Sequence, residues 1–353
     1  MGWLAWSAGA ETSQLHPSVR VDSQIATGAL VLEAPLPSDD RASTLLELGC
    51  LHPEPCLLRI QSIPGEGFSV LLTRGTHVFH ALISHTLTAR TDTFRLTYNW
   101  NADTGAGLLS IEHPGDSELF SNPLKDCPPF PGALILSAMS EMRSRPVDDE
   151  AVSYVGFHKG PLAIGPCATL DYHTPILTPN GYAKIGTLQS GDTVVSEGGD
   201  IVPVLARFTR TTPAYGSSAP IRLRAPYFGL QSDLVMAGTQ HLIVGGSIVD
   251  YTFGRDTVLI PAQHLANGTA GISQPTRGLA TYHQLLLPEG EAMIASGLAV
   301  ESLFIGRLRR RKEIFAHTTL AQMPRHLLPE HATPVSQILQ PFEAITLADM
   351  RAA

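Results

Sequence analysis

Hydrophobic and polar residues alternate over short segments in the first third of the chain. Along 94–100, Leu96, Tyr98 and Trp100 fall on one face of an extended strand, and the odd-numbered residues beginning with Arg95 fall on the other. Turn residues separate several segments of this kind, which include 28–33, 56–63, 68–73, 77–83, 94–100 and 107–112. Short strands at this spacing predict an antiparallel β-sandwich over residues 1–130.

A break follows this region, because prolines interrupt residues 128–132. Residues 133–142 suit a short helix that ends before Arg145-Pro146, and residues 148–150 form an acidic hinge. The pattern therefore predicts a linker with one short helix over residues 131–160.

The second half again consists of short segments that are rich in β-branched residues and separated by turns. The expected strands are 174–178, 193–196, 201–205, 221–224, 242–244, 257–261 and 292–295, and a further short segment, 182–188, follows the turn at 179–181. Residues 263–267 suit a single helical turn, and we expect no long regular helix. The predicted fold class is therefore all-β, with a second domain over residues 161–353.

Composition and charge support two globular domains. The 353 residues are 43% hydrophobic and 16% charged, which is typical of a chain with a buried core. Residues 1–150 hold 9 basic against 18 acidic residues and the remainder holds 15 against 14, so we expect a boundary near residue 150. The acidic first half argues against nucleic-acid binding. One basic run, 307–312, fits either a solvated surface or an anionic partner.

The sequence gives no signal for a metal, a cofactor or a membrane span. The four cysteines lack metal-ligand spacing, and Cys50 and Cys56 are either paired in an oxidising compartment or two buried thiols. No cofactor motif is present. The apolar N-terminus lacks the basic flank of a signal peptide, and no apolar run reaches about 18 residues. Location stays open between the cytoplasm and export by a non-classical route.

From about residue 165 onward the chain resembles the Hint family, the self-processing fold shared by Hedgehog proteins and inteins, and within it a bacterial branch. Four blocks in order carry the resemblance: TPILTPNGYAKIGTLQSGDTVVSEGG at 174–199, APIRLRAPYFG at 219–229 with DLVMAGTQHLIV at 233–244, DYTFGRDTVLIPAQHLANG at 250–268, and TYHQLLLPEGEAMIASGLAVESLFIG at 281–306. The resemblance implies a disc-like β domain.

The hairpin at 94–112 is similar to those of laminin-G-like and concanavalin-like lectin sandwiches. This narrower resemblance implies a glycan or protein ligand for the first domain. The alternative is a packing domain whose aromatic residues form the core.

The Hint resemblance implies that a side chain at the start of the domain attacks the carbonyl of the residue before it, giving a thioester or an ester. Cys167 is the better nucleophile by chemistry, because a thiol ionises more readily than a hydroxyl. The family spacing, counted back nine residues from Thr178, instead reaches Thr169. Three alternatives stay open: an active Cys167, an active Thr169, or no self-cleavage.

The resemblance also implies that His241 protonates the leaving backbone nitrogen. Gly238 replaces the hydroxyl residue expected three positions earlier, which makes Thr239 a candidate substitute. Asp233 precedes the same strand and is a candidate for orienting the imidazole.

Two further departures indicate a degenerate catalytic apparatus, because Gln284 and Gly290 stand where the family has histidines. His283 adjoins Gln284, but a shift of one residue places it on the opposite face of a strand. The chain ends without the His-Asn pair that splicing uses, so we expect no splicing. The predicted function is autoprocessing by an N–S or N–O acyl shift at the start of the Hint domain. The alternatives are a non-catalytic two-domain β scaffold and an extracellular carbohydrate- or protein-binding protein.

Overall fold

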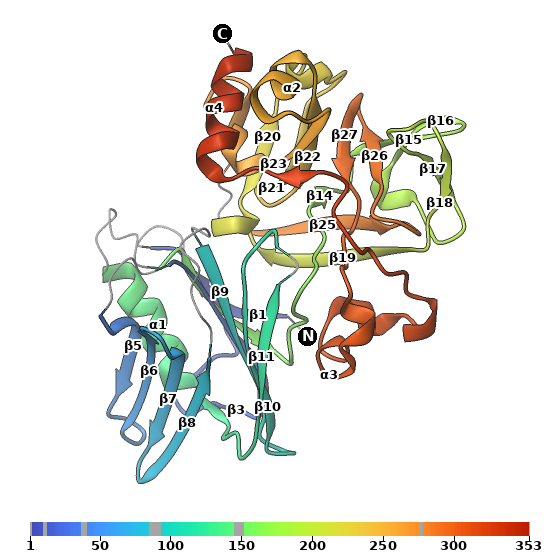
Figure 1. Cartoon of the computed structure of the whole chain (residues 1–353). Coiled ribbons are helices and arrows are strands. Elements are labelled where there is room, and N and C mark those ends of the chain that lie inside the picture. The colour runs from blue at the N-terminus through green and yellow to red at the C-terminus, as the bar shows by residue number, and fades with distance from the viewer. Residues whose placement is uncertain are drawn as a thin grey trace. The chain divides into compact units, whose positions relative to one another are not determined.

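The computed structural model describes residues 2–9, 13–36, 41–84, 93–116, 118–144, 152–274 and 278–352. The chain forms two compact units, Met1–Ile164 and Gly165–Ala353 (Figure 1). Each unit is described by itself.

Over its described residues, the first unit contains two large antiparallel sheets and one α-helix. The seven-stranded sheet has the order β11 (Leu119–Leu124), β10 (Ala106–Glu112), β9 (Thr93–Asn101), β4 (Thr27–Pro35), β13 (Tyr154–Lys159), β1 (Trp3–Ser7) and β2 (Gln14–Leu15). The four-stranded sheet has the order β5 (Ser43–Cys50), β6 (Cys56–Ile63), β7 (Gly67–Arg74) and β8 (His77–Ile83). A short pair, β12 (Phe130–Pro131) with β3 (Gln24–Ile25), precedes the helix α1 (Gly132–Ser144).

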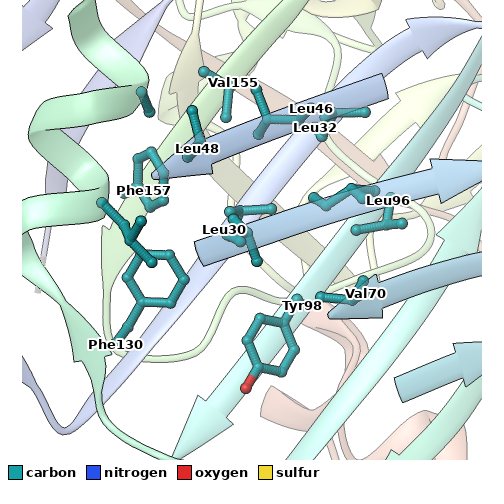
Figure 2. Close-up of a cluster of buried hydrophobic side chains, with 14 of the residues drawn as sticks. Leu30, Leu32, Leu46, Leu48, Val70, Leu96, Tyr98, Phe130, Val155 and Phe157 are labelled. Atoms are coloured by element: carbon teal, nitrogen blue, oxygen red, sulfur yellow. The ribbon is translucent and has the colours of Figure 1, made fainter. Parts of the chain in front are cut away.

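Both sheets and the helix contribute to one hydrophobic core (Figure 2). Val70 from the four-stranded sheet and Phe157 from the seven-stranded sheet are both buried in it. Leu96, Tyr98 and Trp100 lie in the same core, as their alternation predicts. The shared core of two antiparallel sheets confirms the predicted sandwich.

The opposite face of the seven-stranded sheet carries a buried ionic triad. Arg95 on β9 lies directly between Glu33 on β4 and Glu112 on β10 in the strand register. Its guanidinium donates to a Glu33 oxygen at 3.0 Å and to a Glu112 oxygen at 2.8 Å. Because all three side chains are almost completely buried, the Arg95 charge offsets part of the cost of burying the two carboxylates.

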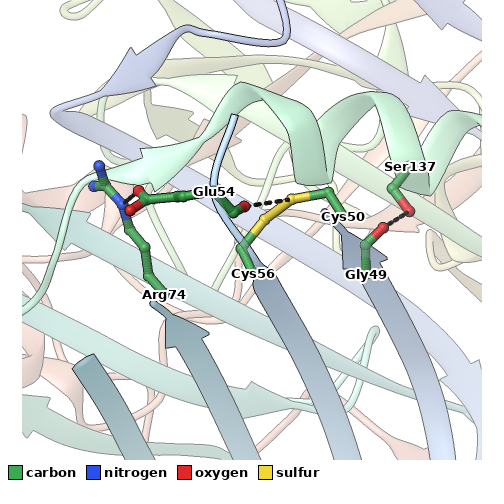
Figure 3. The surroundings of a disulfide bond; sticks show 6 residues. All are labelled: Gly49, Cys50, Glu54, Cys56, Arg74 and Ser137. Carbon is green, nitrogen blue, oxygen red and sulfur yellow. Dashed lines mark hydrogen bonds and ion pairs between the residues drawn. A yellow bond between two sulfur atoms is a disulfide. The ribbon is translucent and has the colours of Figure 1, made fainter. Parts of the chain in front are cut away.

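A disulfide joins the facing ends of β5 and β6, between Cys50 and Cys56 (Figure 3). The adjoining end of β5 is held to the helix, because Ser137 of α1 donates to the Gly49 carbonyl at 3.1 Å. The structure thus decides between the two alternatives that the sequence left open for this cysteine pair.

The segment expected as a linker differs from the prediction. Its helix is present as α1, but the strand β13 lies between β4 and β1 in the seven-stranded sheet. Residues 154–159 therefore belong to the sandwich, and the boundary between units falls after Ile164. The pattern also missed β1, β5 and β11; Trp3–Ser7 is buried on both faces and so shows no alternation. The acidic hinge at 148–150 lies outside the described residues.

The second unit is built on two further sheets and a short hairpin. One sheet has the order β19 (Ala206–Pro213), β25 (Leu279–Leu286), β14 (Leu170–Asp171), β21 (Leu234–Ala237), β20 (Pro220–Leu223) and β24 (Gly271–Ser273). The other has the order β16 (Gly181–Lys184), β15 (Pro175–Thr178), β26 (Ala292–Ala295), β27 (Leu298–Glu301), β22 (His241–Gly245), β23 (Thr257–Pro261) and β28 (Gln337–Ile338). The hairpin pairs β17 (Thr193–Val195) with β18 (Ile201–Pro203).

Among the described residues of this unit, the α-helices are α2 (Ser247–Phe253), α3 (Lys312–Phe315) and α4 (Pro341–Ala352). The expectation of no long regular helix is wrong for α4, which has 12 residues. Ala344, Leu347 and Ala348 recur at helical spacing and are buried in the core of the unit. Pro341 supplies the first helical position, where a missing amide hydrogen costs nothing.

His331 attaches the C-terminal segment to the rest of the second unit. Its Nδ1 accepts a hydrogen bond from the Ile305 amide at 3.2 Å, and its Nε2 donates to the Leu287 carbonyl at 3.2 Å. The ring is therefore the neutral Nε2–H tautomer. Burial lowers the pKa of His331 below its usual value, which keeps the ring neutral.

Candidate functional site

Four strands bring the candidate residues together inside the second unit. Thr169 immediately precedes β14, and its carbonyl accepts a hydrogen bond from the Ala237 amide at 2.7 Å, at the end of β21. Gln240 and His241 follow the turn from β21 into β22, and Gln284 belongs to β25. These chain segments are neighbours because β14 pairs with both β21 and β25.

The Thr169 hydroxyl lies in a buried amide cluster. It donates to Gln240 Oε1 at 2.5 Å, and Gln284 Nε2 lies 3.3 Å from the same hydroxyl oxygen. Gln284 Nε2 also donates to Gln240 Oε1 at 3.0 Å, and both amide nitrogens lie 3.1 Å from the Glu301 carbonyl oxygen. Gln240 Nε2 donates once more, to the His241 carbonyl at 2.8 Å. The hydroxyl proton of Thr169 therefore faces an amide oxygen, which is an acceptor but not a base.

His241 is held by a carboxylate from the end of β27. Its Nδ1 lies 2.6 Å from Glu301 Oε2, and both side chains are buried. This pairing assigns the hydrogen to Nδ1 and leaves Nε2 as the atom that exchanges protons. Nε2 makes no hydrogen bond within the part of the chain that the structure describes. The pair is an acid–base group whose ring orientation is fixed by Glu301.

Glu301 was missed by sequence reasoning, which proposed Asp233 for this role. Asp233 is exposed and instead binds Arg222, with Nε at 2.7 Å, and the Ala225 amide at 2.9 Å. These bonds hold the pKa of Asp233 below its usual value, with the amide as the largest cause. Glu301 is the last residue of the otherwise apolar strand Leu298–Glu301. A carboxylate at the end of a buried strand needs a partner, and this feature of the sequence could have identified Glu301 as the partner of His241.

Cys167 lies outside the amide cluster. The thiol is free and partly buried, and no hydrogen bond of it occurs among the described residues. The carbonyl before it has a partner from far along the chain, because Thr319 Oγ1 donates to the Pro166 oxygen at 3.0 Å. Thr239 is partly buried in the turn before β22, and its side chain makes no hydrogen bond to any described residue. The structure thus hydrogen-bonds the Thr169 side chain to the Gln240 side chain, whereas the side chains of Cys167 and Thr239 make no such bond.

His283 and Gln284 point to opposite faces of β25, as their adjacent positions predict. His283 Nδ1 lies 3.1 Å from both an Arg207 nitrogen and the Thr209 hydroxyl, away from the amide cluster. Burial, reinforced by the Arg207 charge, lowers the pKa of His283. His283 therefore does not replace the histidine for which Gln284 stands.

Gly238 leaves little room for a side chain. A Cβ at this position would lie 3.1 Å from Gln263 Cβ, which is a tight contact. The hydroxyl side chain that the Hint resemblance places at position 238 is absent here, and the turn packs closely against Gln263 in its place.

The described residues include no group of three or more His, Cys, Asp or Glu side chains arranged to hold a metal. None of the described helices has the length and apolar character needed to cross a membrane. The groups gathered at the cluster are a hydroxyl, two amides and an imidazole–carboxylate pair.

Comparison with known proteins identifies a family for part of the chain. The family described as the Hint domain matches residues 168–307. No curated protein matches the sequence. Among solved structures, full-length tailspike protein 2 from Escherichia coli O157:H7 bacteriophage CAB120 shows 11% identity and a TM-score of 0.24, over 45% of this chain and 21% of that chain. The enzymatically active domain of bacteriophage CBA120 tailspike protein 2 shows 7% identity and a TM-score of 0.24, over 55% of this chain and 24% of that chain. This chain therefore spans less than a quarter of either tailspike chain, and a likeness this distant carries no argument.

Proposed function

Residues 168–307 are a Hint domain, and from this premise we propose that the domain cleaves the chain at its own front edge, slowly, through Thr169. One observation carries the proposal. The Thr169 hydroxyl is the group held in the buried cluster that adjoins the His241–Glu301 pair.

The reaction is an N–O acyl shift at the Ala168–Thr169 bond. Thr169 Oγ1 attacks the Ala168 carbonyl carbon and loses its proton, and the bond from that carbon to the Thr169 nitrogen then breaks as the nitrogen takes up a proton. The product is an ester with a free amino group on Thr169, which water hydrolyses. His241, protonated on both ring nitrogens beforehand, supplies the proton to the nitrogen from Nε2 and becomes neutral, and Glu301 stabilises the positive charge that the ring carries before this transfer. The proton lost by Thr169 passes to water, from which the ring is protonated again.

The reaction is expected to be slow because no base faces the nucleophile. The Thr169 hydroxyl donates its hydrogen bond to the amide oxygen of Gln240, and a hydroxyl without a neighbouring base is a poor nucleophile at neutral pH. Thr169→Cys supplies a more acidic group at the same place, so we expect faster cleavage in that variant.

A second candidate is an N–S acyl shift at the Pro166–Cys167 bond. It is favoured by the Thr319 hydroxyl, which already donates to the carbonyl oxygen that would become the oxyanion. The two candidates differ in the bond that breaks, and therefore in the masses of the fragments.

Intact-mass measurement of the purified chain with and without hydroxylamine, which intercepts esters and thioesters, tests the proposal. We expect a slow loss of the 37.8 kDa species and a fragment ending at Ala168. Thr169→Ala abolishes this cleavage, whereas Cys167→Ala and the control Cys127→Ala, which removes the other free thiol, leave it unchanged. Cleavage after Pro166 that Cys167→Ala abolishes establishes the second candidate. If neither the parent chain nor Thr169→Cys yields a fragment, the domain is a non-catalytic β scaffold.

A further inference from the structure

Residues 307–325 concentrate positive charge that the Hint chemistry does not use. They contain six basic residues and a single acidic one, Glu313. Most of this segment follows the matched residues 168–307, and it forms a series of short helical turns that includes Leu308–Arg310, α3 and Arg325–Leu327. These turns surround a hollow of about 440 Å³, lined by Arg309, Arg310, Lys312, Arg325, His326 and Glu330.

The hollow remains positive although it contains one carboxylate. Arg310 binds both oxygens of Glu330, at 3.1 and 3.0 Å from Nε. Hydrogen bonding to Arg310 lowers the pKa of Glu330, so this carboxylate stays ionised and neutralises one of the four surrounding cations. Among the residues that the structure describes, Lys312 and Arg325 have no hydrogen-bond or ion-pair partner for their side chains. Two cations are therefore available to a ligand.

The walls of the hollow are fixed by buried contacts. Arg309 donates to the Leu328 carbonyl at 3.1 Å, and Leu308, Ile314 and Leu328 are buried beneath the charged residues. Beyond Glu330, His331 binds the Ile305 amide and the Leu287 carbonyl. The short turns that carry Lys312 and Arg325 are therefore held in place before a ligand binds, which reduces the backbone entropy lost on binding.

We propose that this hollow binds an anion that carries phosphate groups. The planar guanidinium of Arg325 and the ammonium of Lys312 are the donors that phosphate oxygens accept most strongly, and the hollow has the volume of a small-molecule site. The overall charge of the chain is −8, so general attraction of anions to the whole protein does not account for binding at this place. The proposal does not depend on self-cleavage.

The test is calorimetric titration of the full chain with inorganic pyrophosphate at low ionic strength. The variant is Arg325→Gln with Lys312→Gln. The matched control is Arg255→Gln with Lys184→Gln, which removes one Arg and one Lys at exposed positions outside the hollow. Loss of charge-assisted hydrogen bonds from both residues is expected to raise Kd about tenfold or more, and the control is expected to leave it unchanged. Circular dichroism checks that both variants are folded.

Cosedimentation with phosphatidylcholine vesicles, with and without phosphatidic acid, distinguishes a lipid headgroup from a free phosphate. Binding in either assay that is lost in the hollow variant and kept in the control supports the proposal and identifies the source of the phosphate. Equal weakening in both variants shows general charge attraction and overturns it. Absence of binding in both assays overturns it as well.

Discussion

Replacing either of the two glutamines in the buried cluster is expected to change the stability of the protein by a different amount, although the two side chains are chemically identical. Gln240→Leu and Gln284→Leu each replace an amide by an apolar group of similar size. Gln240 accepts the Thr169 hydroxyl proton and donates to two carbonyls. Gln284 donates only to acceptors that already have another donor, except for Thr169 Oγ1, and its own Oε1 is buried without a partner.

The magnitudes follow from what each change leaves unpaired. Gln240→Leu leaves the buried Thr169 hydroxyl without its acceptor and removes several hydrogen bonds, so we expect a cost of about 2–4 kcal/mol. Gln284→Leu loses hydrogen bonds of about 1 kcal/mol each but also removes the unsatisfied Oε1, which offsets them by about 1–3 kcal/mol. The expected net change for Gln284→Leu lies within about 1 kcal/mol of zero.

Native-state hydrogen exchange read by mass spectrometry measures the difference where it arises. The amides of β22 and β27 are expected to exchange about 30-fold faster in Gln240→Leu than in Gln284→Leu, which corresponds to about 2 kcal/mol. Tryptophan fluorescence during urea unfolding serves as the control, because Trp3, Trp6 and Trp100 all belong to the first unit. Equal exchange in the two variants, or faster exchange in Gln284→Leu, would show that the hydrogen-bond assignment is wrong.

The remaining predictions concern features outside the cluster. Arg95→Met removes the guanidinium that pairs with both buried carboxylates and is expected to cost about 3–5 kcal/mol by urea unfolding, whereas Arg59→Met at an exposed ion pair is expected to cost less than about 1 kcal/mol. Similar costs would contradict the role of burial. Cys50 and Cys56 are expected to resist labelling by maleimide in denaturant until a reductant is added, and labelling without reductant would contradict the disulfide. Replacing both cysteines by Ser is expected to lower the free energy of unfolding by about 2 kcal/mol. Burial lowers the pKa of His331, so as pH falls the unfolded protein takes up a proton on this residue before the folded protein does. The contribution of His331 to stability is therefore complete above about pH 6.5 and declines below it. His331→Gln is expected to flatten this pH dependence of the free energy of unfolding.

Local patterns predicted only those strands whose residues report on a single face or an adjoining turn. The strands 56–63, 77–83, 257–261 and 292–295 have the predicted bounds. The pattern failed where burial covers both faces, as in Trp3–Ser7, and where the decisive contact is distant. Nothing local to Tyr154–Lys159 shows that it lies between β4 and β1, since those partners are more than a hundred residues away.

The same distinction holds for the site. The sequence by itself indicated the Hint family, which matches residues 168–307, and the placement of His283 and Gln284 on opposite faces, because these depend on the order of the sequence blocks and on strand periodicity. Only the tertiary structure decided that Glu301 rather than Asp233 holds His241, and that Thr169 rather than Cys167 enters the amide cluster. Those choices depend on which strands become neighbours, and a hydrogen bond between residues 60 or more positions apart leaves no periodic trace in the chain.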